Sequence, residues 1–326
     1  MLVTLSAKSP AALSNYVRNL AEYLKEGNRP LADVAYTLNL GRDDYSYRHA
    51  CVVGSQQQLI ENLEDVLRSD ENSGWYHTAQ AVPPLVFLFS SHGTAVDRNL
   101  VDYLAERFPV FKQIRNQCHQ FTSPDAPSPQ VDTFVFQYAV YHLWNSLGLT
   151  SQKIIGTGIG NRVVEVITGK TMLPEALQAA AHQEFRPFNQ SEFKKVFANI
   201  LQTDNPVFLE MGREGLLSKA AQDFRAELGE FQMLPSFNNG VRSGLLPALR
   251  QLYLNGAAIN WEQFYEGQLR FRVELPTYPF EPTRCWHSAL IEKSATAPAQ
   301  VSSPAPTTGD QFGVLIEEDP SETEKK

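Results

Sequence analysis

Hydrophobic and polar positions at the start of the chain follow first a strand period and then a helix period. Residues 1–6 alternate apolar and polar side chains, which is typical of a half-buried strand. Ser9 can cap a following helix and Pro10 suits its first position, and apolar residues then recur at helical spacing. The same patterns predict a helix, a strand and another helix over residues 31–38, 48–54 and 55–68. These elements predict a small α+β domain, which we bound at residues 1–78.

Strands and helices alternate through residues 79–255, and this alternation predicts an α/β domain. The near-continuous apolar run at residues 84–90 is typical of a parallel strand that is buried on both faces. Further strands are predicted at residues 153–155 and 206–212. The pattern predicts helices over residues 99–121, 134–147, 190–202 and 245–254.

The C-terminal part of the chain changes composition twice. Residues 256–293 are rich in aromatic residues and proline, which favours an extended strap lying over other elements. Residues 294–326 are dominated by Ala, Pro, Ser and Thr, and this composition predicts a disordered tail. The tail carries four of the eight net negative charges, so the rest of the chain is only mildly acidic.

Composition excludes several classes of protein. A net charge of −8 leaves no basic face to neutralise phosphates, so we expect no nucleic-acid partner. Three widely spaced cysteines rule out a disulfide framework and offer no zinc-site spacing, and we expect no metal or other cofactor. No apolar stretch reaches the ~20 residues of a membrane span, and residues 1–10 lack a signal-peptide layout. We therefore expect a cytoplasmic protein without a membrane partner.

The sharpest local motif is the strand, turn and helix that begin at Lys153. Its turn reads G-x-G-x-G, with glycines at Gly156, Gly158 and Gly160. A nucleophile elbow has this frame, with a serine at the centre of the turn and glycines where side chains would clash with the neighbouring strand and helix. Here the central residue is Gly158, which has no atom that can attack a carbonyl.

The same glycines allow two other interpretations. A glycine-rich loop after a strand can cradle the phosphates of a nucleotide or of coenzyme A, but this spacing departs from the dinucleotide fingerprint. No acidic residue follows about 20 residues later in a strand, as that fingerprint requires. The third interpretation is purely structural: the glycines permit a tight turn against the sheet.

Several blocks, in order, resemble the acyltransferase region of modular polyketide synthases. The resemblance covers about residues 1–288. It rests on residues 2–9 and 31–38, 86–93 with 108–111, 137–148, 206–212, and 275–280 preceded by Asn260-Trp261 and Phe264-Tyr265. It implies an α/β fold: a small α+β linker domain like that between ketosynthase and acyltransferase, then a reduced α/β-hydrolase-like domain of the malonyl-CoA:ACP acyltransferase type, then a post-acyltransferase strap.

The departures from that family fall on its catalytic positions. The elbow of the family reads G-H-S-x-G, so Thr157 and Gly158 replace its His and Ser, and Asn161 stands where an acid usually follows. The family's G-Q-G oxyanion loop corresponds to Ser91, His92 and Gly93, and its carboxylate-binding Arg falls on Gln183. The segment that holds the ferredoxin-like subdomain and the histidine base is missing. The nearest histidine, His182, is expected on the elbow helix and matches no motif.

These features predict a pseudo-acyltransferase, a non-catalytic scaffold or docking module of a polyketide assembly line. Its expected partners are a ketosynthase, an acyl carrier protein or a trans-acting acyltransferase. The aromatic residues that we expect at such an interface are Trp261, Phe264, Tyr265, Tyr278, Phe280 and Trp286. The alternatives are a protein that binds or hydrolyses acyl thioesters with Thr157 or His92, and a binder of nucleotide or coenzyme A at the glycine turn.

Overall fold

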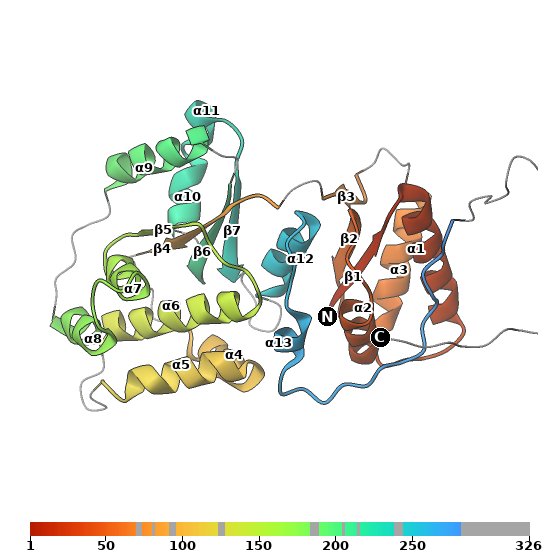
Figure 1. The fold of residues 1–326 in the computed structure, drawn as a ribbon, viewed down its shortest axis with the longest axis horizontal. Helices are drawn as coiled ribbons and strands as arrows, with labels where there is room; N and C mark the ends of the chain where they lie inside the picture. The colour runs from red at the N-terminus through yellow and green to blue at the C-terminus, as the bar shows by residue number, and fades with distance from the viewer. Residues whose placement is uncertain are drawn as a thin grey trace, which may run out of the picture. The chain divides into compact units, whose positions relative to one another are not determined.

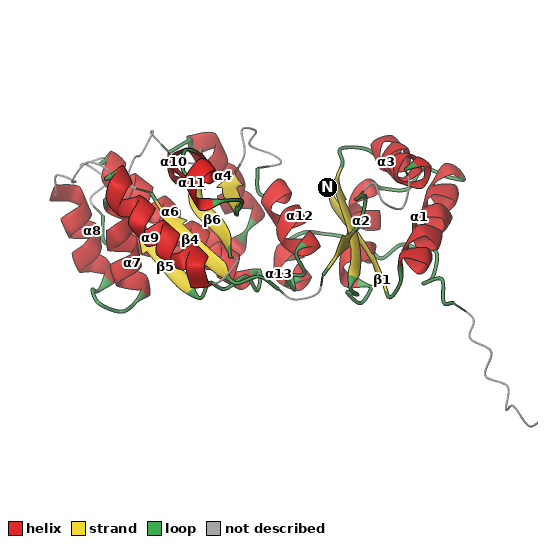
Figure 2. Cartoon of the chain, turned by 90° about the horizontal axis from the view of Figure 1, so that it is seen from above, coloured by secondary structure: helices red, strands yellow, loops and turns green. Residues whose placement is uncertain are grey.

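The N-terminal part of the computed structural model joins three antiparallel strands to three helices. The structure describes residues 1–69, 74–79, 82–90, 96–122, 128–182, 189–203, 206–213, 216–237 and 244–281. The N-terminal elements are β1 (Leu2–Ala7), α1 (Pro10–Lys25), α2 (Leu31–Leu40), β2 (Tyr47–Val52), α3 (Gln56–Arg68) and β3 (His77–Thr78). The strand order is β1-β2-β3. Figure 2 shows this sheet between α1–α3 and α12 (Leu246–Leu254).

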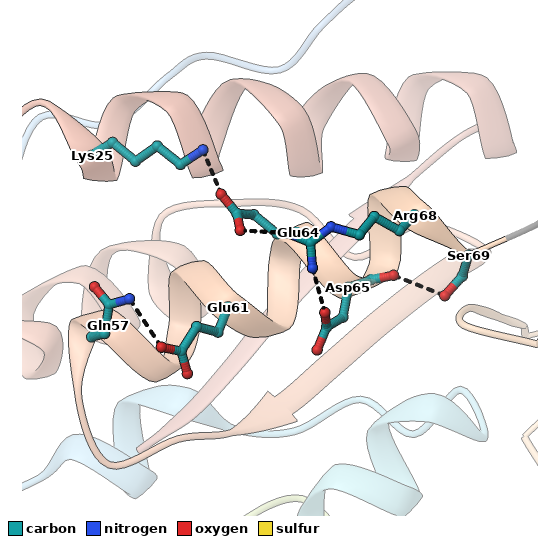
Figure 3. Close-up of polar contacts among 7 residues, drawn as sticks. All are labelled: Lys25, Gln57, Glu61, Glu64, Asp65, Arg68 and Ser69. Carbon is teal, nitrogen blue, oxygen red and sulfur yellow. Dashed lines mark hydrogen bonds and ion pairs between the residues drawn. The ribbon is translucent and has the colours of Figure 1, made fainter.

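Local signals in the sequence set the ends of these helices. The Ser9 and Ser55 hydroxyls accept hydrogen bonds from backbone N–H groups in the first turns of α1 and α3. Polar side chains of α3 form hydrogen bonds and ion pairs along the helix (Figure 3). Among them, Glu64 forms ion pairs with Lys25 of α1 and with Arg68. These pairs are exposed to solvent, so each contributes little to stability.

The central part of the chain is a four-stranded parallel sheet with helices on both faces (Figure 1). The strand order is β5-β4-β6-β7. The strands are β4 (Leu85–Phe89), β5 (Lys153–Gly156), β6 (Val207–Arg213) and β7 (Gln232–Phe237). The helices are α4 (Arg98–Arg107), α5 (Pro109–His119), α6 (Pro129–Ser146), α7 (Ile159–Ile167), α8 (Leu173–His182), α9 (Gln190–Thr203), α10 (Leu216–Gln222) and α11 (Arg225–Leu228).

Strand β4 is buried on both faces, as its apolar run predicts. Phe87 and Phe89 belong to the core that includes α4–α8 and α12. Val86 and Leu88 belong to a second core with α9 and α10. The α/β fold expected from the sequence is therefore confirmed.

Three local predictions were wrong. The helix expected over residues 99–121 is two helices, because Phe108 precedes Pro109 and takes an extended conformation, which ends α4. His182 does not lie on the elbow helix, because α7 ends before Gly169, at a φ of +70°, and α8 then begins. Strand β7 was missed because Pro235 interrupts its apolar pattern.

Three of the six aromatic residues expected at an interface are instead buried in the chain's own core. Trp261, Phe264 and Tyr265 are 6–7% exposed. Their spacing places them on one face of a short helix, α13 (Trp261–Tyr265), where the sequence predicted an extended strap. Tyr278 is partly buried, Phe280 is 79% exposed, and Trp286 lies outside the described residues. Of the described candidates, only Phe280 is available to a partner as the prediction required.

After α13 the chain runs back along the N-terminal elements, where the blue strap follows α2 and α1 in Figure 1. The backbone N–H groups of Phe271 and Val273 donate to the Asp33 carboxylate and the Thr37 hydroxyl of α2. The Tyr23 hydroxyl of α1 donates to the Glu274 carbonyl at 2.8 Å. The contacts group Met1–Phe280 into one unit and Glu281–Lys326 into another, and all elements named here lie in the first.

One buried side chain joins three segments of the first unit. The Asn39 amide donates to the Leu2 carbonyl at 3.0 Å and to the Tyr265 hydroxyl at 2.9 Å. Its carbonyl oxygen accepts from the Thr4 backbone N–H and hydroxyl. The Asn39 side chain of α2 thus forms hydrogen bonds with both β1 and α13.

We expect Asn39→Ala to lower the free energy of unfolding by about 2–4 kcal/mol, because buried partners would lose their hydrogen bonds. Chemical denaturation followed by circular dichroism measures this change. Asn15→Ala on the exposed face of α1 is the matched control and should change it by less than about 0.5 kcal/mol. Equal effects of the two substitutions would contradict this assignment.

Candidate functional site

The sharp turn between β5 and α7 is the most constrained backbone near the predicted site. Strand β5 ends at Gly156, paired in register with Phe89 of β4, and α7 begins at Ile159. Between them Gly158 has a φ of +55° and a ψ of −117°. Residues with side chains rarely adopt this conformation, and it costs on the order of 1–3 kcal/mol where they do. The turn thus has the strained geometry expected of a nucleophile elbow.

The two flanking glycines are required by close backbone packing. A Cβ added at Gly160 would lie 2.3 Å from the Phe89 carbonyl oxygen. A Cβ at Gly156 would lie 2.7 Å from the Gly160 carbonyl and from the Asn161 nitrogen. The clash with strand and helix that the sequence analysis predicted is therefore present at both positions.

No side chain at the turn is set up as a nucleophile. Gly158 has none, and the Thr157 backbone N–H donates to the Phe89 carbonyl at 2.9 Å. The Thr157 hydroxyl also faces that carbonyl, at 3.5 Å. Within the described ranges, no histidine forms a hydrogen bond with Thr157. The described residues therefore show no contact between a nucleophile and a base at this turn.

A cleft of about 670 Å³ lies beside the elbow. One wall is the turn, with Ile155, Thr157, Gly158 and Asn161. The other wall is the start of α9, from Asn189 to Phe193 together with Val196. This volume lies in the range of small-molecule sites. Among the lining residues in the described part of the chain, Glu192 is the one charged side chain.

Several predicted site residues fall outside the described part of the chain. These are Ser91, His92 and Gly93 of the degenerate oxyanion loop, and Gln183 at the position of the carboxylate clamp. His182 is described and lies exposed at the end of α8.

Sequence reasoning missed Gln137 as a positioning residue. It is 2% exposed in the middle of α6, and its amide nitrogen donates to the Ser90 carbonyl at 2.9 Å. It therefore holds Ser90, the residue that follows β4. The signal was available, because Gln137 is a polar residue within a strongly apolar helix pattern.

Two cysteines are buried thiols without a catalytic setting. Burial raises the pKa of Cys51 and of Cys118 to about 12, so both stay protonated at neutral pH. Among the residues that the structure places, no group of three or more His, Cys, Asp or Glu is arranged to hold a metal. A search of the same residues finds no helix long and apolar enough to cross a membrane.

Known proteins support the predicted resemblance. Residues 1–63 match the family described as CurL-like, PKS C-terminal, where PKS stands for polyketide synthase. Hispidin synthase from Neonothopanus nambi is 28% identical over 208 residues, covering 54% of this chain and 12% of that protein. The solved acyl transferase domain of ZmaA has a TM-score of 0.66 at 17% identity, covering 85% of this chain and 98% of that one. The acyltransferase domain from module 8 of the salinomycin polyketide synthase has a TM-score of 0.64 at 14% identity, covering 81% and 97%.

The chain resembles the acyltransferase region of polyketide synthases. At these identities the structural likeness shows a shared fold. The chain spans about a tenth of the length of the curated relatives it matches. This region has a parallel sheet and a strained turn after β5, with a glycine at the centre of that turn.

We expect Gly160→Ala to lower the free energy of unfolding by about 1–3 kcal/mol, because its Cβ would overlap the Phe89 carbonyl. Thermal denaturation of the variant measures the loss. Gly212→Ala is the matched control, since a Cβ there meets no atom within 4 Å. A Gly160→Ala protein as stable as Gly212→Ala would show that α7 does not pack against β4 this closely.

Proposed function

We propose that this acyltransferase-like region is a non-catalytic scaffold or docking module of a polyketide synthase assembly line, served by a separate acyltransferase. The observation that carries the proposal is the elbow. Gly158 occupies the strained central position with a φ of +55°, while Gly156 and Gly160 keep the close packing that such a turn needs. The architecture of the site persists without its nucleophile.

The energetic cost of losing a nucleophile argues against acyl transfer through a covalent acyl-enzyme. Removing the nucleophile or the base of a serine hydrolase lowers kcat on the order of 10⁶-fold. Here Thr157 faces a backbone carbonyl and lacks a histidine partner among the described residues. None of the described residues that line the cleft is a cation that could hold a carboxylated acyl group. We therefore infer that acyl transfer is not this chain's task.

The retained contacts support a docking role. Asn39 joins the N-terminal elements to α13, and hydrogen bonds from the strap to α2 hold the strap in place. None of these bonds involves a residue of the cleft. The partners that we propose are a ketosynthase, an acyl carrier protein or a trans-acting acyltransferase. Phe271 and Phe280 on the strap are 61% and 79% exposed, and they offer apolar contacts to such a partner.

We expect neither the native chain nor Gly158→Ser to form an acyl-enzyme with malonyl-coenzyme A, because the serine alone would lack a base. Intact-mass spectrometry after incubation with the thioester measures loading. A catalytically intact acyltransferase domain is the positive control, and circular dichroism establishes that Gly158→Ser is folded. Loading of either protein at the control's rate would overturn the non-catalytic assignment.

We expect the tagged chain to recover a ketosynthase, a carrier protein or a separate acyltransferase from the lysate of its source cell. Truncation at Ser294 removes the tail, and the double substitution of Phe271→Ser and Phe280→Ser changes only exposed side chains of the strap. Mass spectrometry identifies the bound proteins, and loss of capture only with the double substitution would assign binding to the strap. Absence of these partners from the captured proteins would contradict the docking proposal.

A second function is favoured by the cleft, whose volume of about 670 Å³ suits a small acyl group. In this alternative the chain binds or hydrolyses acyl thioesters. Release of free thiol from the thioester in the loading experiment, lost in His92→Ala, would support it. A nucleotide or coenzyme A at the glycine turn is less favoured, because none of the described lining residues is a cation that could face its phosphates.

A further inference from the structure

A second cavity lies among α4, α5 and the first turns of α6. Helix α5 packs against both of the other helices (Figure 1). The volume of the cavity is about 330 Å³, at the lower end of the range of small-molecule sites. None of its described lining residues lines the elbow cleft. The cavity is therefore a separate candidate site, which the proposed function does not use.

The buried side chains that line this cavity are apolar. Phe111 of α5 and Phe136 of α6 meet edge to face, with 6.1 Å between their ring centres. Val131 and Val135 of α6 are also buried and line the same cavity. These four residues form its apolar floor. Such a floor can take apolar surface of a ligand out of water, so it suits the apolar body of a small molecule.

Arg115 of α5 is the least exposed of the titratable side chains that line the cavity. The others are Arg98 and Asp102 of α4, His119 of α5 and Asp132 of α6, and all four are exposed. The Arg115 side chain is 34% exposed, whereas that of Asp102 is 68% exposed. The charge that lies closest to the protein interior is therefore positive, which favours an anionic ligand.

The hydrogen-bond donors of Arg115 are not taken up by its acidic partner. Nη1 of Arg115 lies 3.8 Å from Oδ1 of Asp102, which is an ion-pair distance but too long for a hydrogen bond. In the part of the chain that the structure describes, the Arg115 guanidinium forms no hydrogen bond with another residue. Its planar fork can therefore bind a carboxylate through two parallel hydrogen bonds.

The charges that line the cavity balance at neutral pH. His119 lies one helical turn after Arg115. Burial, with a further contribution from the charge of Arg115, lowers the pKa of the His119 imidazole, although Asp132 opposes the shift, so this side chain is neutral near pH 7. The other titratable lining residues are two arginines and two aspartates. A ligand with one negative charge fits this balance better than a dianionic phosphate, because the aspartates repel a second charge.

We propose that this cavity binds a small monocarboxylic acid. The carboxylate pairs with the Arg115 guanidinium, and the apolar body of the acid lies against the floor that contains Phe111 and Phe136. The pairing supplies charge-assisted hydrogen bonds, and the floor supplies apolar burial. Because no residue of the elbow cleft takes part, this binding does not depend on the proposed docking function.

The probe is 3-phenylpropionate, which joins one aromatic ring to one carboxylate through a short chain. We expect saturable, equimolar binding to the full chain by isothermal calorimetry near neutral pH, and a rise in Tm, because a ligand of the folded state stabilises it. The neutral 3-phenylpropionamide should bind at least about tenfold more weakly, since it lacks the charge that pairs with Arg115. Acetate, which lacks the apolar body, should also bind at least about tenfold more weakly.

Arg115→Gln should weaken the binding of 3-phenylpropionate about tenfold or more, because it removes the charge-assisted hydrogen bonds. Lys112→Gln is the matched control, since it removes one positive charge from an exposed position of the same helix outside the cavity, and it should leave Kd unchanged. Val101→Phe tests the location: Val101 is a half-buried lining residue, and a phenyl ring there would occupy the cavity and abolish binding. Thermal denaturation without ligand establishes that each variant is folded.

Absence of saturable binding of 3-phenylpropionate would overturn the proposal. Binding that both Arg115→Gln and Val101→Phe leave intact would also overturn it, because the ligand would then lie elsewhere, for example in the elbow cleft. Tighter binding of 3-phenylpropylamine than of 3-phenylpropionate would show that the aspartates select the ligand, against the proposal. Loss of binding in these two variants but not in Lys112→Gln would support it, whatever the outcome of the acyl-loading and capture experiments.

Discussion

The central sheet and the candidate site depend on the contact between the backbone of α7 and that of β4. Gly160 approaches the Phe89 carbonyl so closely that no side chain fits between them. The same carbonyl accepts the Thr157 N–H, which holds the start of the turn beside the strand. The parallel pairing of β4 with β5 and the positive φ of Gly158 occur beside this contact.

The rest of the first unit is organised around buried polar side chains that join distant segments. Asn39 joins α2 and β1 to α13, and Arg48 of β2 donates to the carbonyl of Tyr253 in α12 and to that of Ala257, which follows the helix. Such bonds are strong inside a protein because water does not compete for them. They place the start of the strap on the N-terminal elements without any contribution from the elbow cleft. The hydrogen bonds that hold the N-terminal elements, α12 and α13 together therefore do not involve the residues of the elbow cleft.

Sequence patterns predicted those features that depend on neighbouring residues. The caps of α1 and α3, the apolar run of β4 and the need for glycine at position 156 have local causes. Gly160 was identified from the local motif, although the atom that excludes a side chain there belongs to Phe89 of a distant strand. Pro109 was also a local signal for the boundary between α4 and α5. The apolar residues continue at helical spacing across it, so the sequence pattern predicted one helix.

Other features have causes that lie far away in the sequence. The start of α9 forms a wall of the cleft more than 30 residues after the turn, and periodicity cannot show such a pairing. The aromatic residues of α13 seemed suited to a partner, but α2 and α12 of the same chain bury them. Composition identifies aromatic side chains that are expected to be buried. Only the fold shows whether they are buried by the same chain or by a partner.

The bonds of Asn39 have a consequence for association between molecules. Strand β1 is at the edge of its sheet, and an open edge is a template to which another chain can add a strand. The Leu2 carbonyl and the Thr4 N–H are already bonded to the Asn39 amide, so they are closed to an incoming backbone. One side chain thereby closes two of the backbone groups through which a strand of another molecule could add to β1.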